Sequence, residues 1–142
     1  MTTETALGWF FSVEIDDGRS LGAWTKCEGL SVEWDLHEYK EGGVNDYIHR
    51  LPGRTKYQNL KLTRPVTAAT ADVIAWLREV SPTQDWPDAK VSVRDAAGEV
   101  VATWTFGQVR PVKWQGPVLD VGQNQVAMEV LELAHNGFLG QA

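Results

Sequence analysis

The sequence predicts a mostly β protein, built as a small antiparallel β-barrel or as two packed sheets, with one α-helix on its side. Three observations support this: several segments alternate apolar and polar residues, one segment has helical periodicity, and the connections between them are short. The chain has 142 residues with 43% hydrophobic content and seven Trp, enough to bury a core. With no linker or internal repeat in the sequence, we expect a single domain over residues 1–142.

The first strands are expected before residue 41. Trp9–Asp16 alternates loosely and ends at the turn signal Asp17-Gly18. Leu21–Cys27 and Leu30–Lys40 follow as strands. In the second of these, every other residue is apolar, which predicts one buried face; that face consists of Val32, Trp34 and Leu36.

A long loop is expected to follow. The segment Glu41–Arg54 interrupts the alternation with three Gly, an Asn-Asp pair and a Pro. Loops of this length in compact domains are commonly functional. We therefore expect this loop to make contacts between subunits. The strand pattern returns over Lys56–Arg64 and ends at Pro65.

One helix is predicted over Ala68–Val80. Its apolar residues recur at helical spacing and give a single buried stripe, formed by Val73, Trp76, Leu77 and Val80. Thr67 or Thr70 can cap its start, and Ser81-Pro82 ends it.

The remaining third of the chain predicts strands again. These are Lys90–Asp95, a long strand Val100–Trp114 and a last strand Gln125–His135. Gly107 and Pro111 are expected to bend or bulge the long strand. In the last strand the pattern slips phase between Val130 and Leu131, which predicts a bulge there.

The sequence offers no catalytic or metal-binding motif. One Cys and three His stand outside any zinc-site spacing, and the nucleophile-elbow, phosphate-loop and dinucleotide motifs are missing. We therefore expect no enzyme activity, no metal and no cofactor. A net charge of −6 argues against nucleic-acid binding as the main activity. No apolar run is long enough for a membrane span, so we expect synthesis in the cytoplasm and no membrane insertion.

Charge is divided between two neighbouring segments. Residues 28–41 contain five acids and one Lys, whereas residues 50–64 contain five bases and no acid. The two segments can pair as adjacent strands of one subunit, with opposite charges facing across the ladder. Alternatively they lie on opposite sides and attract identical subunits to one another. The sequence supports both arrangements.

These segments also carry a resemblance to a known family. Residues 39–43 (YKEGG) and 51–57 (LPGRTKY) resemble the signature of the T-even-like phage tail tube family, which includes the inner tubes of extracellular contractile injection systems. Further segments resemble that family in the expected order: residues 10–15 (FFSVEI), 27–30 (CEGL), 104–106 (WTF) with 111–114 (PVKW), and 131–138 (LELAHNGF). The resemblance spans nearly the whole chain. Asn136 and Phe138 differ from the residues usual in that family. Such differences are compatible with a paralogue, for example the subunit of a tube-initiating ring.

The resemblance implies a structural subunit. Two antiparallel sheets and a flanking helix, as in type VI secretion tubes, would form hexameric rings that stack into a hollow tube inside a contractile sheath. Partners would be a sheath protein, baseplate or initiator and cap proteins, and a cargo of protein effector or DNA, in a phage-tail-like particle or virion. Contacts between subunits or rings are expected at Glu38, Glu41, Gly42, Gly43, Asn45, Asp46, Arg50, Arg54 and Lys56. The outer helix surface, with Asp72, Arg78 and Glu79, is expected to face the sheath.

Two alternatives stay open at this point. A tube-initiator or adaptor ring at the baseplate would be built from the same kind of subunit. A small-ligand-binding β-barrel belongs to a different class, in which an apolar pocket inside one subunit does the work.

Overall fold

The computed structural model describes residues 9–15, 18–39, 49–80, 86–122 and 126–139, with the backbone alone at 37–39 and 49–53. Ten strands and one helix lie in these ranges. They are β1 Phe10–Ile15, β2 Arg19–Trp24, β3 Lys26–Glu28, β4 Val32–Tyr39, β5 His49–Tyr57, β6 Leu60–Pro65, α1 Thr70–Val80, β7 Ala89–Arg94, β8 Val100–Phe106, β9 Arg110–Gln115 and β10 Met128–Ala134.

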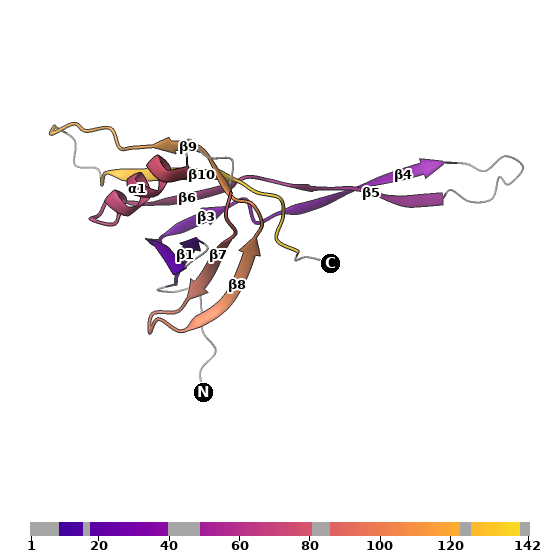
Figure 1. The fold of residues 1–142 in the computed structure, drawn as a ribbon, viewed down its shortest axis with the longest axis horizontal. Coiled ribbons are helices and arrows are strands. Elements are labelled where there is room, and N and C mark those ends of the chain that lie inside the picture. Colours follow the sequence, from indigo (N-terminus) through magenta and orange to yellow (C-terminus); the bar gives the residue numbers. More distant parts are fainter. Residues whose placement is uncertain (1–8, 16–17, 40–48, 81–85, 123–125, 140–142) are drawn as a thin grey trace, which may run out of the picture.

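The strands form two four-stranded sheets and one two-stranded sheet. The strand orders are β2-β1-β7-β8, β3-β6-β10-β9 and β4-β5, and every pairing is antiparallel. The two larger sheets and α1 make up the body, and the β4–β5 hairpin projects from it (Figure 1). The prediction of a mostly β fold with two packed sheets and a flanking helix is confirmed. The described strands do not close into a barrel.

Three predicted strands are each divided between sheets. The predicted strand Val100–Trp114 breaks into β8 and β9, which belong to different sheets. At the break, Gln108 has a positive φ of 50°, and Gly107 exchanges backbone hydrogen bonds with the segment after β10. The predicted strand Lys56–Arg64 likewise breaks between β5 and β6, and the predicted strand Leu21–Cys27 breaks between β2 and β3. These junctions let the chain cross between sheets, which alternation alone does not reveal.

The predicted phase slip in β10 is wrong. Glu129, Leu131 and Leu133 are all fully buried, so the inward face keeps an unbroken period of two. The sequence suggested a slip because a charged residue, Glu129, occupies an inward position while Val130 lies on the other face. The register of β10 against β9 shifts later, between Glu132 and Leu133.

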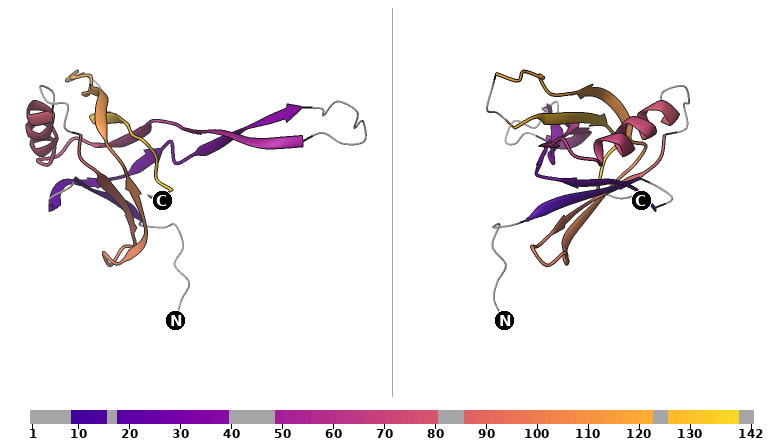
Figure 2. Two further views of the ribbon diagram at one scale, coloured as in Figure 1. Left: turned by 45° about the vertical axis from the view of Figure 1, so that its right-hand side comes forward. Right: turned by 90° about the vertical axis from the view of Figure 1, so that its left-hand side faces the viewer.

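The predicted helix is confirmed, with its start moved from Ala68 to Thr70. The preceding residues form a turn in which Thr67 Oγ1 accepts a hydrogen bond from the backbone N–H of Ala69, 3.2 Å away. The helix covers one side of the body (Figure 2). Its inward residues join the core formed between the two larger sheets; those fully or nearly buried are Val73, Trp76 and Val80.

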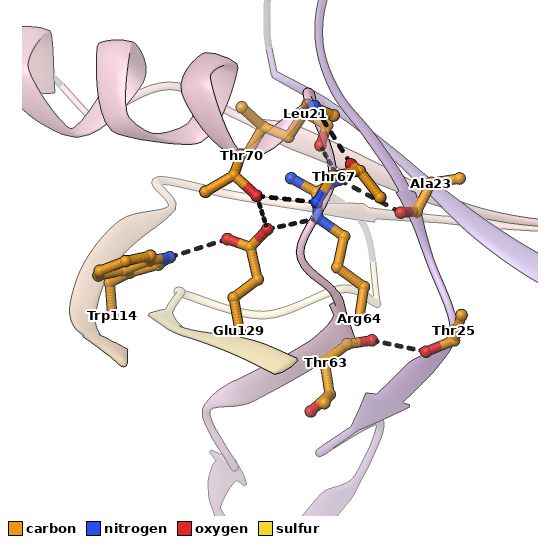
Figure 3. Close-up of polar contacts among 10 residues, drawn as sticks. Leu21, Ala23, Thr25, Thr63, Arg64, Thr67, Thr70, Trp114 and Glu129 are labelled. Atoms are coloured by element: carbon orange, nitrogen blue, oxygen red, sulfur yellow. Dashed lines mark hydrogen bonds and ion pairs between the residues drawn. The ribbon is translucent and has the colours of Figure 1, made fainter. Parts of the chain in front are cut away.

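A buried ion pair lies where the sheets and the helix meet (Figure 3). Arg64 of β6 and Glu129 of β10 are 2% and 0% exposed, and Arg64 Nε donates to Glu129 Oε2 over 2.9 Å. The guanidinium Nη1 donates to the carbonyl oxygens of Leu21 and Ala23 on β2, at 2.8 and 3.2 Å. The guanidinium carbon Cζ of Arg64 lies 3.9 Å from the ring centroid of Trp24. One arginine thus joins the two larger sheets.

The carboxylate of Glu129 extends the network to two further elements. Trp114 Nε1 of β9 donates to Glu129 Oε1 over 2.9 Å, and the Thr70 hydroxyl of α1 donates to Glu129 Oε2. Burial disfavours the charged carboxylate, but these hydrogen bonds and the adjacent Arg64 outweigh it and hold the pKa of Glu129 below its ordinary value. In the sequence Arg64 is one of the five bases of residues 50–64, and the pattern singled out neither Arg64 nor Glu129 as a buried charge.

Removing the indole of α1 should destabilise the subunit. Trp76 is 2% exposed and packs in the core, so Trp76→Ala is expected to cost about 3–5 kcal/mol through lost apolar burial and a residual cavity. Urea unfolding followed by circular dichroism measures this. The exposed Arg78→Ala on the same helix is the control and should change stability by no more than about 0.5 kcal/mol; equal losses in both would contradict the packing.

Neutralising the buried carboxylate should be comparably costly. Glu129→Gln keeps the side-chain shape but leaves the Arg64 charge buried without a counterion, for which we expect a loss of about 3–5 kcal/mol. Glu132→Gln, on the other face of β10, is the matched control. Its carboxylate accepts a hydrogen bond from Asn59, which can persist with an amide oxygen, so a change below about 1 kcal/mol is expected. Similar urea midpoints for the two variants would show that the pair does not stabilise the fold.

Candidate assembly site

The β4–β5 hairpin extends away from the body in Figure 1 and in the left view of Figure 2. Its two strands pair only with each other, from Val32 opposite Tyr57 to Tyr39 opposite His49, with an irregularity between Trp34 and Leu36. A two-stranded hairpin is marginally stable by itself in water. This arm therefore differs from the rest of the fold in having no second layer beside it.

The apolar face of β4 is exposed, contrary to the prediction that it is buried. Trp34 and Leu36 have 57% and 58% of their surface accessible, and Val32 near the body is half-buried. The alternation was identified correctly, but no sheet formed by the described residues covers this face. Clustered large apolar side chains on a projecting arm are typical of a surface that binds a partner.

The predicted loop Glu41–Arg54 is shorter than expected. Its last six residues belong to β5, in which Pro52 is opposite Leu36. Proline is tolerated at this position because each strand of a two-stranded sheet has one free edge. The proline was misread in the sequence as a sign of a loop. Five of the expected contact residues lie outside the described residues: Glu41, Gly42, Gly43, Asn45 and Asp46.

The charged segments lie side by side in the hairpin. In the ladder Glu33 is opposite Lys56 and Glu38 is opposite Arg50, and Lys56 Nζ is 3.3 Å from Asp35 Oδ2. For Lys56, pairing within one subunit is therefore what the structure shows. Arg54 is exposed and has no ion pair with any side chain in the described part of the chain. Attraction between subunits stays a prediction for the residues of this arm.

An aromatic cluster fixes the hairpin to the body. Tyr57, the last residue of β5, contacts His135 and Phe138 edge-on, with ring centroids 5.6 and 5.3 Å apart. Phe106 of β8 contacts the same two rings, at 4.8 and 5.6 Å. Gly137, with a φ of 123°, lets the chain pass so close to Tyr57 that a Cβ would lie 2.6 Å from its ring. The root of the arm is thus built from β5, β8 and the segment after β10.

His135 is hydrogen-bonded through both ring nitrogens. Its Nε2 lies 2.9 Å from the Gln58 carbonyl oxygen, and its Nδ1 accepts a hydrogen bond from the Gly137 N–H over 3.0 Å. This pattern requires the neutral ring with its proton on Nε2. Burial lowers the pKa of His135 below its ordinary value, the Gln58 carbonyl opposes this, and the nearby Arg110 charge adds to the lowering.

The outer surface of α1 carries the three charges predicted to face a sheath. Asp72, Arg78 and Glu79 are all exposed. Glu79 forms an ion pair with Arg19 of β2, so one of them also ties the helix to a sheet edge. A role in sheath binding stays a prediction.

Sites for chemistry are not evident in the described residues. Within them, no three or more His, Cys, Asp or Glu side chains are grouped to hold a metal ion. No helix in the same ranges has the length and apolar composition to cross a membrane. Burial raises the pKa of the Cys27 thiol to about 11, so this thiol stays protonated and unreactive at neutral pH.

The family comparison agrees with this geometry. Residues 8–139 match the family model described as "T4-like virus tail tube protein gp19". This chain belongs to that tail tube family. The family is one of structural tube proteins, and a tube-type structural role follows for the chain. A comparison with curated protein sequences gives no match.

Solved structures of contractile injection systems share the fold of this tail tube protein. A chain of the PVC sheath-tube complex in the extended state is 24% identical, with a TM-score of 0.73 over 93% of this chain and 88% of that one. A chain of the PVC sheath/tube terminator gives 22% identity and a TM-score of 0.75 over 100% and 99%. A chain of the anti-feeding prophage tube-terminating cap gives 23% and 0.71 over 94% and 87%.

Acidification should weaken the hairpin root of the tail tube protein. Because the folded state keeps His135 neutral, its contribution to stability is complete above pH ~6.5, the ordinary histidine pKa, and declines as the pH falls toward the lowered folded-state value. Urea midpoints of the parent at several pH values between 7.5 and 5 should therefore decrease. His135→Gln, which cannot titrate, should have a smaller decrease over this interval. Parallel pH profiles for the two proteins would show that His135 does not cause the loss.

Proposed function

We propose that this protein is the repeating subunit of the inner tube of a contractile injection system or contractile phage tail. Six copies form a ring, rings stack into a hollow tube, and cargo passes through the lumen. The single observation that carries this proposal is the projecting β4–β5 arm with Trp34 and Leu36 exposed, on a chain of the tail tube family. A face this apolar requires cover, and the described part of the subunit supplies none.

Sheet edges give a second reason for self-association. The strands β2, β8, β3 and β9 are the outer strands of the two larger sheets. Unpaired edges invite pairing with other chains, and closing a ring of copies removes them. Ring closure therefore satisfies backbone groups at the same time as it covers apolar side chains.

The proposed partners follow from the same architecture. A sheath protein would contact the outer surface of α1 at Asp72, Arg78 and Glu79, which are exposed. Baseplate or initiator and cap proteins would contact the terminal rings, and the lumen would carry a protein effector or DNA. The subunit would be made in the cytoplasm and incorporated there into a phage-tail-like particle or virion.

An initiator or terminator ring is the second candidate. The same fold occurs in a tube terminator and in a tube-terminating cap as well as in a sheath-tube complex. Electron microscopy of the purified protein separates the candidates: a repeating subunit gives tubes of many rings, and a terminal ring gives single rings. A stable monomer that binds a hydrophobic ligand would instead indicate a small-ligand-binding β-barrel.

Removing the exposed apolar side chains should abolish assembly without unfolding the subunit. We expect Trp34→Ser with Leu36→Ser to keep the urea midpoint within about 0.5 kcal/mol, since exposed positions contribute little to stability, and to give no rings or tubes under negative stain. Glu33→Ser, also exposed on β4, is the control and should assemble. Tubes from the double variant as abundant as those of the parent would refute the role of the arm.

Charge reversal tests whether the arm also attracts its neighbour electrostatically. We expect Arg54→Glu with Lys56→Glu to give folded subunits or single rings that do not stack, with partial rescue by Glu38→Lys and Glu41→Lys. Each exposed pair contributes only about 0–1 kcal/mol, but the symmetry of a ring repeats it. If the double variant forms tubes as readily as the parent at low salt, the charges act within the subunit, as the Lys56–Asp35 contact does.

A further inference from the structure

A second exposed apolar surface lies on the connection between β9 and β10. Val118 and Leu119 have 84% and 85% of their surface accessible, and Val121 and Val126 are also largely exposed. We call these four residues the apolar flap. A single exposed aliphatic residue is ordinary, whereas several on one connection mark a surface that is covered in the working state of a protein.

Local contacts shape the described parts of the flap connection. At its start, Gly116 lies close to the Trp114 ring, where a Cβ would come within 2.8 Å of the indole. At Asp120, the Oδ1 atom accepts a hydrogen bond from the Gly122 N–H over 2.9 Å. At its end, the Val66 N–H donates to the Ala127 carbonyl oxygen over 2.9 Å, which joins this end to the residue after β6.

The flap and the hairpin lie at opposite ends of the long axis of the molecule. In Figure 1 the segment after β9 reaches the left extreme, and the β4–β5 arm reaches the right. A subunit cannot cover either surface with the other, because the body separates them. Two copies placed end to end can cover both.

The two surfaces also match in chemistry. The arm presents Trp34 and Leu36 together with Arg54, an exposed base that forms no ion pair with another described side chain, whereas Lys56 is paired with Asp35 within the arm. The described flap segments, 116–122 and 126–127, contain a single charge, that of Asp120. An apolar contact between arm and flap would thus allow the Arg54 guanidinium to lie near the Asp120 carboxylate.

We propose that the apolar flap of one copy of this chain binds the β4–β5 arm of a second copy. The contact is heterologous, because it joins two different surfaces, so it leaves a free arm at one end and a free flap at the other and propagates from copy to copy. This inference rests on the proposed tube function, since it names the surface that receives the arm during assembly.

Mixed cysteine cross-linking tests the contact directly. In a Cys27→Ala background, one preparation carries Leu36→Cys and a second, differently tagged, carries Leu119→Cys. After the two are mixed under assembly conditions and mildly oxidised, we expect a covalent dimer that contains both tags. Ala96→Cys, exposed on the β7–β8 turn, replaces Leu119→Cys in the control and should give at least tenfold less mixed dimer.

A flap variant provides an independent measurement. Val118→Ser with Leu119→Ser and Val121→Ser should unfold in urea like the parent, because these side chains are exposed, and should give no ordered assemblies under negative stain. Rings or tubes without mixed dimer, or with as much dimer from Ala96→Cys, overturn the arm-to-flap contact and leave the tube function intact. Normal assembly of the flap variant also overturns it. No assemblies from the parent itself overturn both proposals.

Discussion

The rest of the structure depends on one buried ion pair, between Arg64 and Glu129. Each charge is removed from water. Arg64 Nη2 is buried with no hydrogen-bond partner among the described residues, but the other polar atoms of the pair have partners that offset the cost of burial. Those partners come from different elements: two carbonyl groups of β2, the indole of β9 and a hydroxyl of α1. The requirement to satisfy this pair therefore fixes how the two sheets and the helix meet. Hydrophobic burial stabilises the body, and the polar network defines its geometry.

The β4–β5 hairpin projects as an arm from the body that this network organises. Among the described strands no second sheet lies against β4 and β5, and the apolar face of β4 is exposed at Trp34 and Leu36. The cluster of Tyr57, Phe106, His135 and Phe138 anchors the root of the arm. An anchored root and an exposed apolar face are the properties expected of an element whose packing partner is another molecule. The subunit is in this sense an incomplete packing unit, consistent with a tube protein.

The same residues explain which predictions failed. Val32, Trp34 and Leu36 alternate as a buried strand face would, since burial against another subunit and burial within one leave the same pattern. Pro52 and Gly53 suggested a loop, although a two-stranded arm accommodates both. Glu129 interrupts the apolar pattern on the inward face of β10. The carboxylate can be buried there because Arg64 is its counterion, and a sequence pattern does not reveal that pairing. In each case the deciding feature is a neighbour in space, or the lack of one among the described residues, and not a neighbour in the sequence.

By itself, the sequence determined the mostly β class, the helix with its buried stripe and the family motifs, because these depend on local periodicity, capping and short contiguous segments. Only the tertiary structure decided where strands change sheets, which charges are buried, and that the arm and the apolar flap lie at opposite ends. Those features depend on contacts between residues such as Arg64 and Glu129, which are 65 positions apart. Periodicity records which side of a strand is covered, but the identity of the covering surface is a property of three-dimensional packing.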